Sequence, residues 1–216
     1  SKALDYFKKS LNLDLSFFGE NHPEVASGYY NIGYVYFAQG DYSKALEYFE
    51  EVLKIRLSVY GENHSRVASV YNDIGEIYSV QGDDFKALDY FKKSLKIVLS
   101  VYGENHSQVS SIYDHIGEVY FAQKDYSKAL YYFEESLKIR LSLFGENHPE
   151  VALSYYSIGS LYIIQGDKSK ALNYYEKSLK IRLSVYGENH PLTKEIMDLI
   201  NVAANSKVLQ SPETTK

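Results

Sequence analysis

The tetrapeptide Gly-Glu-Asn-His recurs at a constant interval along the chain. It begins at residues 19, 61, 103, 145 and 187, so each step is 42 residues without insertion or deletion. A fixed period of this length is typical of solenoid proteins, in which identical supersecondary units stack on their neighbours. This period constrains the fold more strongly than any other feature of the sequence.

Each unit carries the apolar patterns of two amphipathic helices separated by a turn. The first has apolar residues at i, i+4, i+7 and i+11, namely Val25, Tyr29, Ile32 and Tyr36. Gln39-Gly40-Asp41 follows, with a glycine suited to a left-handed C-terminal cap and an aspartate suited to an N-cap. In the third unit Lys124 replaces this glycine, which predicts a cost of about 1 kcal/mol if the conformation is kept. The second helix is predicted to end near Tyr60, before the next linker glycine.

These spacings resemble the tetratricopeptide repeat (TPR) family, whose pattern is aromatic-x-x-Leu-Gly-x-x-Tyr followed by Ala and Phe on the second helix. The corresponding residues of the first unit are Tyr29, Ile32, Gly33, Tyr36, Ala45 and Phe49, and they recur in the next three units, with Tyr175 in place of the last Phe. The unit is eight residues longer than the family's usual 34, and its G-x-x-H-P linker is similar to that of the kinesin-light-chain type. The resemblance covers about residues 1–190.

The resemblance implies an all-α fold, a right-handed α-solenoid of antiparallel helix pairs, over residues 1–204. Residues 1–18 are expected to form an orphan second helix, and 187–204 a capping helix that lacks the pattern. Between them we expect four linker-plus-helix-pair repeats, at 19–60, 61–102, 103–144 and 145–186. Residues 205–216 are polar and are expected to form a flexible tail.

Composition excludes several classes of function. The chain holds 23 Lys+Arg and 28 Asp+Glu, a formal charge of −5, which argues against nucleic acid or an anionic membrane as partner. It has no cysteine, so disulfides, Cys-bearing zinc sites and thiol catalysis are excluded, and a reducing, cytoplasmic location is expected. No phosphate loop, nucleophile elbow or dinucleotide fingerprint occurs. We therefore expect a protein that is not an enzyme and has no cofactor.

Five of the six histidines occupy the linkers, at 22, 64, 106, 148 and 190. Neighbouring units should lie about 10 Å apart, whereas zinc ligands must lie about 2 Å from one point. Successive copies therefore cannot share an ion, and a helix-capping role is expected instead. The Lys and Arg residues near the ends of the second helices, Arg56, Arg140 and Arg182 among them, are expected to interact with the carbonyl ends of those helices.

By resemblance, the first helix of each pair lines a concave groove, and residues at its variable positions are candidate peptide contacts. They are Tyr30, Asn31, Tyr34 and Phe37 in the first repeat; Asn72, Asp73 and Glu76 in the second; Asp114, His115, Glu118 and Phe121 in the third; and Tyr156 in the fourth. The four predicted first helices, taken as residues 24–39, 66–81, 108–123 and 150–165, contain one Lys or Arg residue, Arg66, and six Asp or Glu residues. Their combined formal charge is therefore −5, the same as that of the whole chain. The groove is therefore expected to be acidic at its centre and apolar towards its ends.

The leading hypothesis is a protein–protein interaction scaffold that binds a basic and apolar peptide segment. No lysine occupies a groove position, so the carboxylate clamp known from some TPR proteins is rejected. His115, beside Asp114 and near Glu118, could gain a proton in mild acid and weaken a cationic ligand. One alternative is a structural module that self-associates through an uncapped N-terminal end. Another is the regulatory or sensor arm of a larger protein, since TPR arrays often flank catalytic domains.

Overall fold

The computed structural model describes residues 2–205 and is helical apart from short linkers and turns. The helices are α1 (Lys2–Phe18), α2 (Pro23–Ala38), α3 (Tyr42–Tyr60), α4 (Ser65–Val80), α5 (Asp84–Tyr102), α6 (Ser107–Ala122), α7 (Tyr126–Phe144), α8 (Pro149–Ile164), α9 (Lys168–Tyr186) and α10 (Pro191–Asn205). The predicted all-α class is confirmed. Most of the residues assigned to a flexible tail, 206–216, lie outside the described part of the chain.

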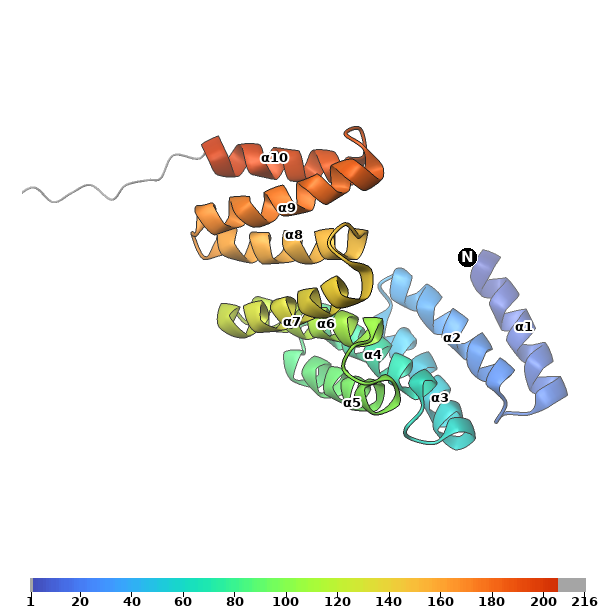
Figure 1. Ribbon diagram of the computed structural model, residues 1–216. Coiled ribbons are helices and arrows are strands. Elements are labelled where there is room, and N and C mark those ends of the chain that lie inside the picture. The colour runs from blue at the N-terminus through green and yellow to red at the C-terminus, as the bar shows by residue number, and fades with distance from the viewer. Residues whose placement is uncertain (1, 206–216) are drawn as a thin grey trace, which may run out of the picture.

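The helices stack in chain order into one solenoid (Figure 1). The largest interfaces join the two helices of each repeat: α2 with α3, α4 with α5, α6 with α7 and α8 with α9. Smaller interfaces join each second helix to the first helix of the next repeat, and α4 also touches α6. Because nearly all contacts are between neighbours in sequence, stability comes from the repeats and their interfaces rather than from one central core.

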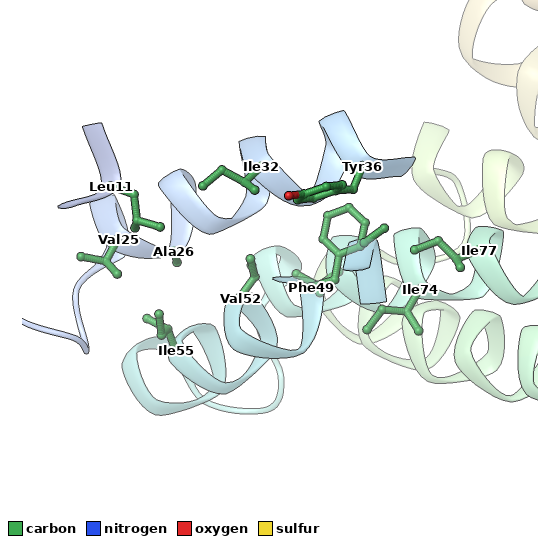
Figure 2. Close-up of a cluster of buried hydrophobic side chains, with 12 residues drawn as sticks. Leu11, Val25, Ala26, Ile32, Tyr36, Phe49, Val52, Ile55, Ile74 and Ile77 are labelled. Carbon is green, nitrogen blue, oxygen red and sulfur yellow. The ribbon is translucent and has the colours of Figure 1, made fainter. Parts of the chain in front are cut away.

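The apolar core is divided along the solenoid, and Figure 2 shows its N-terminal part, between α1 and α4. Ile32 and Phe49 are buried there between the helices of the first pair. The repeat glycine permits the close approach of the helices: a Cβ at Gly75 would lie 2.7 Å from Cε1 of Phe91.

Each linker histidine is the N-cap of the next first helix. The Nδ1 atoms of His22, His64, His106 and His148 accept hydrogen bonds from the backbone N–H two residues ahead, at 3.1–3.3 Å, and His190 does the same at 3.3 Å. Each ring also stacks on the last aromatic residue of the preceding helix, as in the Tyr102–His106 pair, whose ring centroids are 4.1 Å apart. The capping role predicted for these histidines is confirmed, and the stacking is a second role that the sequence pattern did not indicate.

The turns inside the repeats are also uniform. An aspartate caps each second helix of the four full repeats, and Gly40, Gly82 and Gly166 have positive φ. Lys124 keeps the same conformation, with φ of 62°, and is the one non-glycine residue with positive φ among residues 2–205. The conformation that was expected to strain this lysine is therefore retained.

Within residues 2–205, no helix has both the length and the apolar character needed to cross a membrane.

Candidate functional site

First helices from three repeats meet around a cavity of about 170 Å³. Phe37 comes from α2, Glu76 from α4, and His115 and Glu118 from α6. We call the face of α2, α4, α6 and α8 that carries the predicted contact residues the inner face. The structure thus brings four of those residues, which span 82 positions of the chain, to one place.

A chain of hydrogen bonds crosses this cavity from α6 to α4. His115 Nδ1 lies 3.0 Å from Asn72 Oδ1, and Asn72 Nδ2 donates to Glu76 Oε1 at 2.6 Å. The second ring nitrogen of His115 lies 3.6 Å from Glu76 Oε1. Burial raises the pKa of Glu76 and lowers that of His115, in spite of the nearby carboxylates of Glu118 and Asp114. The imidazole is therefore neutral at neutral pH, and protonating it requires a more acidic medium than an exposed histidine would.

Asp114 is partnered by an arginine from the second helix of its own repeat. Arg140 Nη2 lies 2.7 Å from Asp114 Oδ2 and 3.0 Å from Glu150 Oε2, and Nη1 donates to Ser154 Oγ at 2.8 Å. Only 4% of Arg140 is exposed. Burial raises the pKa of Asp114 and the arginine lowers it. This charge is therefore balanced inside the protein and is not free to attract a ligand.

Asp73 is also buried but has no such ion pair. Its carboxyl group faces the Tyr30 hydroxyl and the more distant Arg56, and its Oδ2 atom is buried without a hydrogen-bond partner. Burial, reinforced by the charge of Glu76, raises the pKa of Asp73 to about 7. Tyr30 lies beneath the Arg56 guanidinium, 5.3 Å from the ring centroid, and its ring packs against Phe49.

The remaining predicted contact residues are spread along the inner face. Asn31 and Tyr34 are exposed on α2, and the Tyr34 ring lies 6.4 Å from that of Phe37. Phe121 packs against Tyr126 at the end of α6. Tyr156 lies further along, where its hydroxyl donates to Glu195 Oε1 of α10 at 3.2 Å. The structure does not bring these four residues to the cavity.

The arginines of the second helices correct one expectation. They do not interact with the carbonyl ends of their own helices: no basic residue lies in the last turn of α3, α7 or α9. Arg56, Arg140 and Arg182 instead reach the first helix of the next repeat. The formal charge of −5 was summed over the first helices alone, so it did not include these three arginines. Their recurrence at 42-residue intervals, with Val98 as the exception, was the available signal.

No group of three or more potential ligands that could hold a metal ion occurs within residues 2–205. Asn72 joins His115 to Glu76 by hydrogen bonds, and Glu118 lines the same cavity as those two residues. The three side chains are not arranged as a set of ligands around one point. The chemistry that this arrangement offers is recognition, through two carboxylates, a neutral imidazole and adjoining apolar side chains.

Comparisons with known proteins agree with this geometry. The tetratricopeptide repeat model matches residues 1–58, 27–97, 66–142 and 108–184. No curated protein matches the sequence. Among solved structures, BtubC (BKLC) from P. vanneervenii has a TM-score of 0.80 at 19% identity, over 94% of this chain and 82% of that one. A kinesin-light-chain-like protein from Podosopora anserina, with nearly identical TPR-like repeats, gives 0.70 at 16%, over 86% and 88%.

The apo form of RapI has a TM-score of 0.69 at 18% identity, over 82% of this chain and 62% of that one. At these identities the structures establish the fold alone, whereas the repeat model matches most of the chain. With its helix pairs repeated every 42 residues, the chain belongs to the tetratricopeptide repeat family.

Proposed function

We propose that this protein is a non-catalytic scaffold that holds a peptide or protein segment with basic and apolar side chains along the inner face. TPR arrays are in general interaction scaffolds, which supports the broader part of the proposal. The observation that carries the finer part is the 170 Å³ cavity, where Glu76 and Glu118 adjoin Phe37 and Val80. A basic side chain with an apolar neighbour would satisfy both components.

Apolar contacts are expected to supply most of the affinity. An exposed carboxylate–Lys or carboxylate–Arg contact contributes about 0–1 kcal/mol, so the acids mainly select and orient the segment. Tyr34 is 58% exposed, and Ile163 and Leu153 are exposed on α8. Such residues at well-spaced positions suit an extended ligand anchored at several points.

The preference for a cation is expected to be local. Arg140 offsets Asp114, and burial favours the protonated form of Asp73 as long as no cation lies beside its carboxyl group. Glu76 and Glu118 are the acids that face the cavity, so the basic residue of the ligand is expected to bind between α4 and α6. On α8 the exposed side chains of Leu153, Ile163 and Ile164 are aliphatic, whereas on α2 the exposed Tyr34 lies among polar residues such as Asn31.

Fluorescence anisotropy with labelled peptides tests this function. Three peptides of equal length would be compared. Leucine alternates with lysine and arginine in the basic peptide, with glutamate in the acidic peptide and with serine in the neutral peptide. We expect the basic peptide to bind best and to weaken as salt increases. Stronger binding of the acidic peptide, or equal binding of all three, would contradict the proposal.

Glu118→Lys should weaken the basic peptide, whereas Glu47→Lys is a matched control because Glu47 is exposed on α3, away from the cavity. If Glu118→Lys bound the basic peptide as well as the wild type does, the proposed role of the cavity acids would be contradicted. Asp73→Lys is unsuitable here, since it would place a lysine in a buried position.

A second candidate function is end-to-end self-association, and α1 favours it. Tyr6, Leu13 and Phe17 lie on one face of α1 and are 72%, 59% and 80% exposed. Their equivalents one repeat later include Tyr48 and Ile55, which pack in the core against α2. The face of α1 is thus shaped for a first helix, and α10 is a first helix.

Seating α10 of a second copy on α1 would complete a repeat across the junction. Sedimentation velocity over a range of concentrations tests this function, and Tyr6→Ser with Leu13→Ser should keep the protein monomeric. A monomer at every concentration would contradict it.

A further inference from the structure

One position of the second helix differs in kind between the repeats. Arg56, Arg140 and Arg182 occupy it in the first, third and fourth full repeats, and Val98 occupies it in the second. An arginine therefore lies at three of the four boundaries that follow a full repeat; Asp14 occupies the equivalent position of α1. At the boundary between α5 and α6 this position supplies an isopropyl group.

The three arginines bind the following first helix in related ways. Arg56 Nη1 donates to the carbonyl oxygen of Arg66 at 2.8 Å and to Ser69 Oγ at 2.9 Å. Arg182 Nη1 donates to the carbonyl oxygen of Leu192 at 2.6 Å, which is the equivalent position. Arg140 instead reaches Asp114, Glu150 and Ser154. Each guanidinium fills the space between two successive repeats.

A cavity of about 120 Å³ lies beside Val98. Its lining includes Asn72, Gln108 and Ser111, which are equivalent to three residues at the other boundaries: Asp114 and Glu150, which bind Arg140, and Ser69, which binds Arg56. The volume is several times that needed for one water molecule, and a guanidinium has only four heavy atoms. The repeat pattern has thus kept the surroundings of an arginine without its side chain.

Two buried acceptors at this cavity have no partner. They are Asp73 Oδ2 and Gln108 Oε1, and both residues line the cavity. Buried polar atoms are nearly always hydrogen-bonded in native proteins, so two orphans in one cavity call for a donor. The high pKa of Asp73 agrees with a carboxyl group that lacks a cation.

We propose that the cavity beside Val98 is a specificity pocket for one arginine side chain of the bound segment, whose guanidinium takes the place that Arg56, Arg140 and Arg182 fill at the other boundaries. This inference rests on the proposed function and deepens it. Arginine is favoured over lysine because its planar fork offers five donors to several acceptors at once. Lysine offers three donors around a point charge that is more strongly hydrated.

The direct test uses the full chain and N-acetyl-arginine amide as probe, followed by ¹H–¹⁵N NMR. We expect saturable shifts of the amide signals of Ser69, Asn72 and Ser111. N-acetyl-citrulline amide, which has a similar shape without the charge, should produce at least several-fold weaker binding, and so should N-acetyl-lysine amide. No saturable shift at these residues, or equal binding of citrulline, would overturn the proposal.

Two variants localise the effect. Val98→Arg fills the cavity from within and should abolish the shifts, whereas Val101→Arg adds the same charge at an exposed position of the same helix and should leave them. Asp73→Asn removes the negative charge with little change of shape and should weaken the probe at least several-fold, which keeps the test independent of how well Val98→Arg folds. Retained binding in Asp73→Asn would overturn the proposal.

A peptide arm separates this inference from the function on which it rests. In the basic peptide, arginines would be replaced by citrulline one at a time. We expect one replacement to weaken binding several-fold in the wild type and to have no further effect in Val98→Arg. Equal losses at every position would overturn the pocket while leaving a basic-peptide scaffold intact. Saturable binding of the free amide alone, without peptide binding, would contradict the peptide as the source of the guanidinium.

Discussion

The boundary between α5 and α6 and the boundary between α7 and α8 are formed by equivalent helices of the repeat. They differ in what fills the space between the two repeats. At the second, Arg140 is buried among Asp114, Glu150 and Ser154. At the first, Val98 adjoins a cavity in which Asp73 and Gln108 each leave an acceptor unpaired.

Under the proposal for the cavity beside Val98, one position of the repeat serves the scaffold at one boundary and ligand binding at another. An arginine there stabilises the junction between two repeats. At the boundary where Val98 replaces it, the helices keep their places and a cavity is present whose lining includes Asn72, Asp73 and Gln108. Variation at an interface position is therefore as informative about ligands as variation on the exposed surface.

The largest effect is expected from Arg140→Ala. The substitution leaves Asp114 buried without its cation, which typically costs about 3–5 kcal/mol of stability. Urea unfolding followed by circular dichroism measures the loss, and hydrogen exchange should place it at α7 and α8. Lys138→Ala is the control, because Lys138 makes an exposed ion pair with Glu135 at 3.7 Å and should cost at most about 1 kcal/mol. Equal losses in the two variants would contradict the comparison.

The second prediction concerns pH at the boundary that lacks the arginine. The pKa of Asp73 is about 7, above its usual value of 3.8, so the folded chain binds this proton more tightly than the unfolded chain. Its contribution to stability is therefore complete below about pH 4 and is lost as the pH rises through about 7, by at most about 4 kcal/mol.

Asp73→Asn should flatten this dependence and raise stability near pH 8, as measured by urea unfolding at several pH values. Tyr30, Arg56 and Glu76 face the same carboxyl group and remain in both proteins, so the difference between the two curves isolates Asp73. Parallel curves would show that burial does not raise the pKa of Asp73.

A third prediction compares helix contact in the first and second repeats. A Cβ at Gly75 would lie 2.7 Å from the nearest atom of the Phe91 ring. A Cβ at Gly33 would lie 3.2 Å from the nearest atom of the Phe49 ring. Gly75→Ala should therefore destabilise by about 1–3 kcal/mol. Gly33→Ala should cost less, because the added Cβ would be less crowded there and the gain of about 1 kcal/mol in helix propensity is common to both variants. Thermal unfolding of the two variants checks the order, and a larger loss for Gly33→Ala would contradict it.

The smallest effect is expected at the turn between α6 and α7. Lys124 has φ of 62°, while glycine occupies this position in the other three turns. Lys124→Gly should raise stability by about 1 kcal/mol, because the left-handed conformation has no Cβ penalty in glycine. A rise in melting temperature checks this, with Gln123→Gly as the control. Gln123 has a right-handed conformation, so glycine there should not stabilise.

The repeat architecture could be predicted from the sequence because each of its causes is local. A 42-residue period, a glycine with positive φ and a histidine directly before a helix can all be read from a few neighbouring positions of the chain. The antiparallel pairs follow from the short turns, and the inner-face cavity follows in part from the variable positions of the first helices.

The partners of the acidic residues could not be predicted in this way. Asp73 and Glu118 occupy comparable variable positions, yet Asp73 is more deeply buried than Glu118. The pairing of Asp114 with Arg140 joins residues 26 positions apart and depends on how α7 packs against α6 and α8. Periodicity places a side chain on a face of its helix, but it does not reveal which side chain of a neighbouring helix reaches that face.

The linker histidines have a consequence for how such a chain can change over generations. One ring caps the helix that follows and stacks on the helix that precedes, so every junction is joined in the same way. A unit that is duplicated or exchanged as a 42-residue block would therefore enter the array with its geometry preserved and would carry its residue at position 98 or 140 with it. Recognition elements could be rearranged along the array as whole modules, without rebuilding the joints between them.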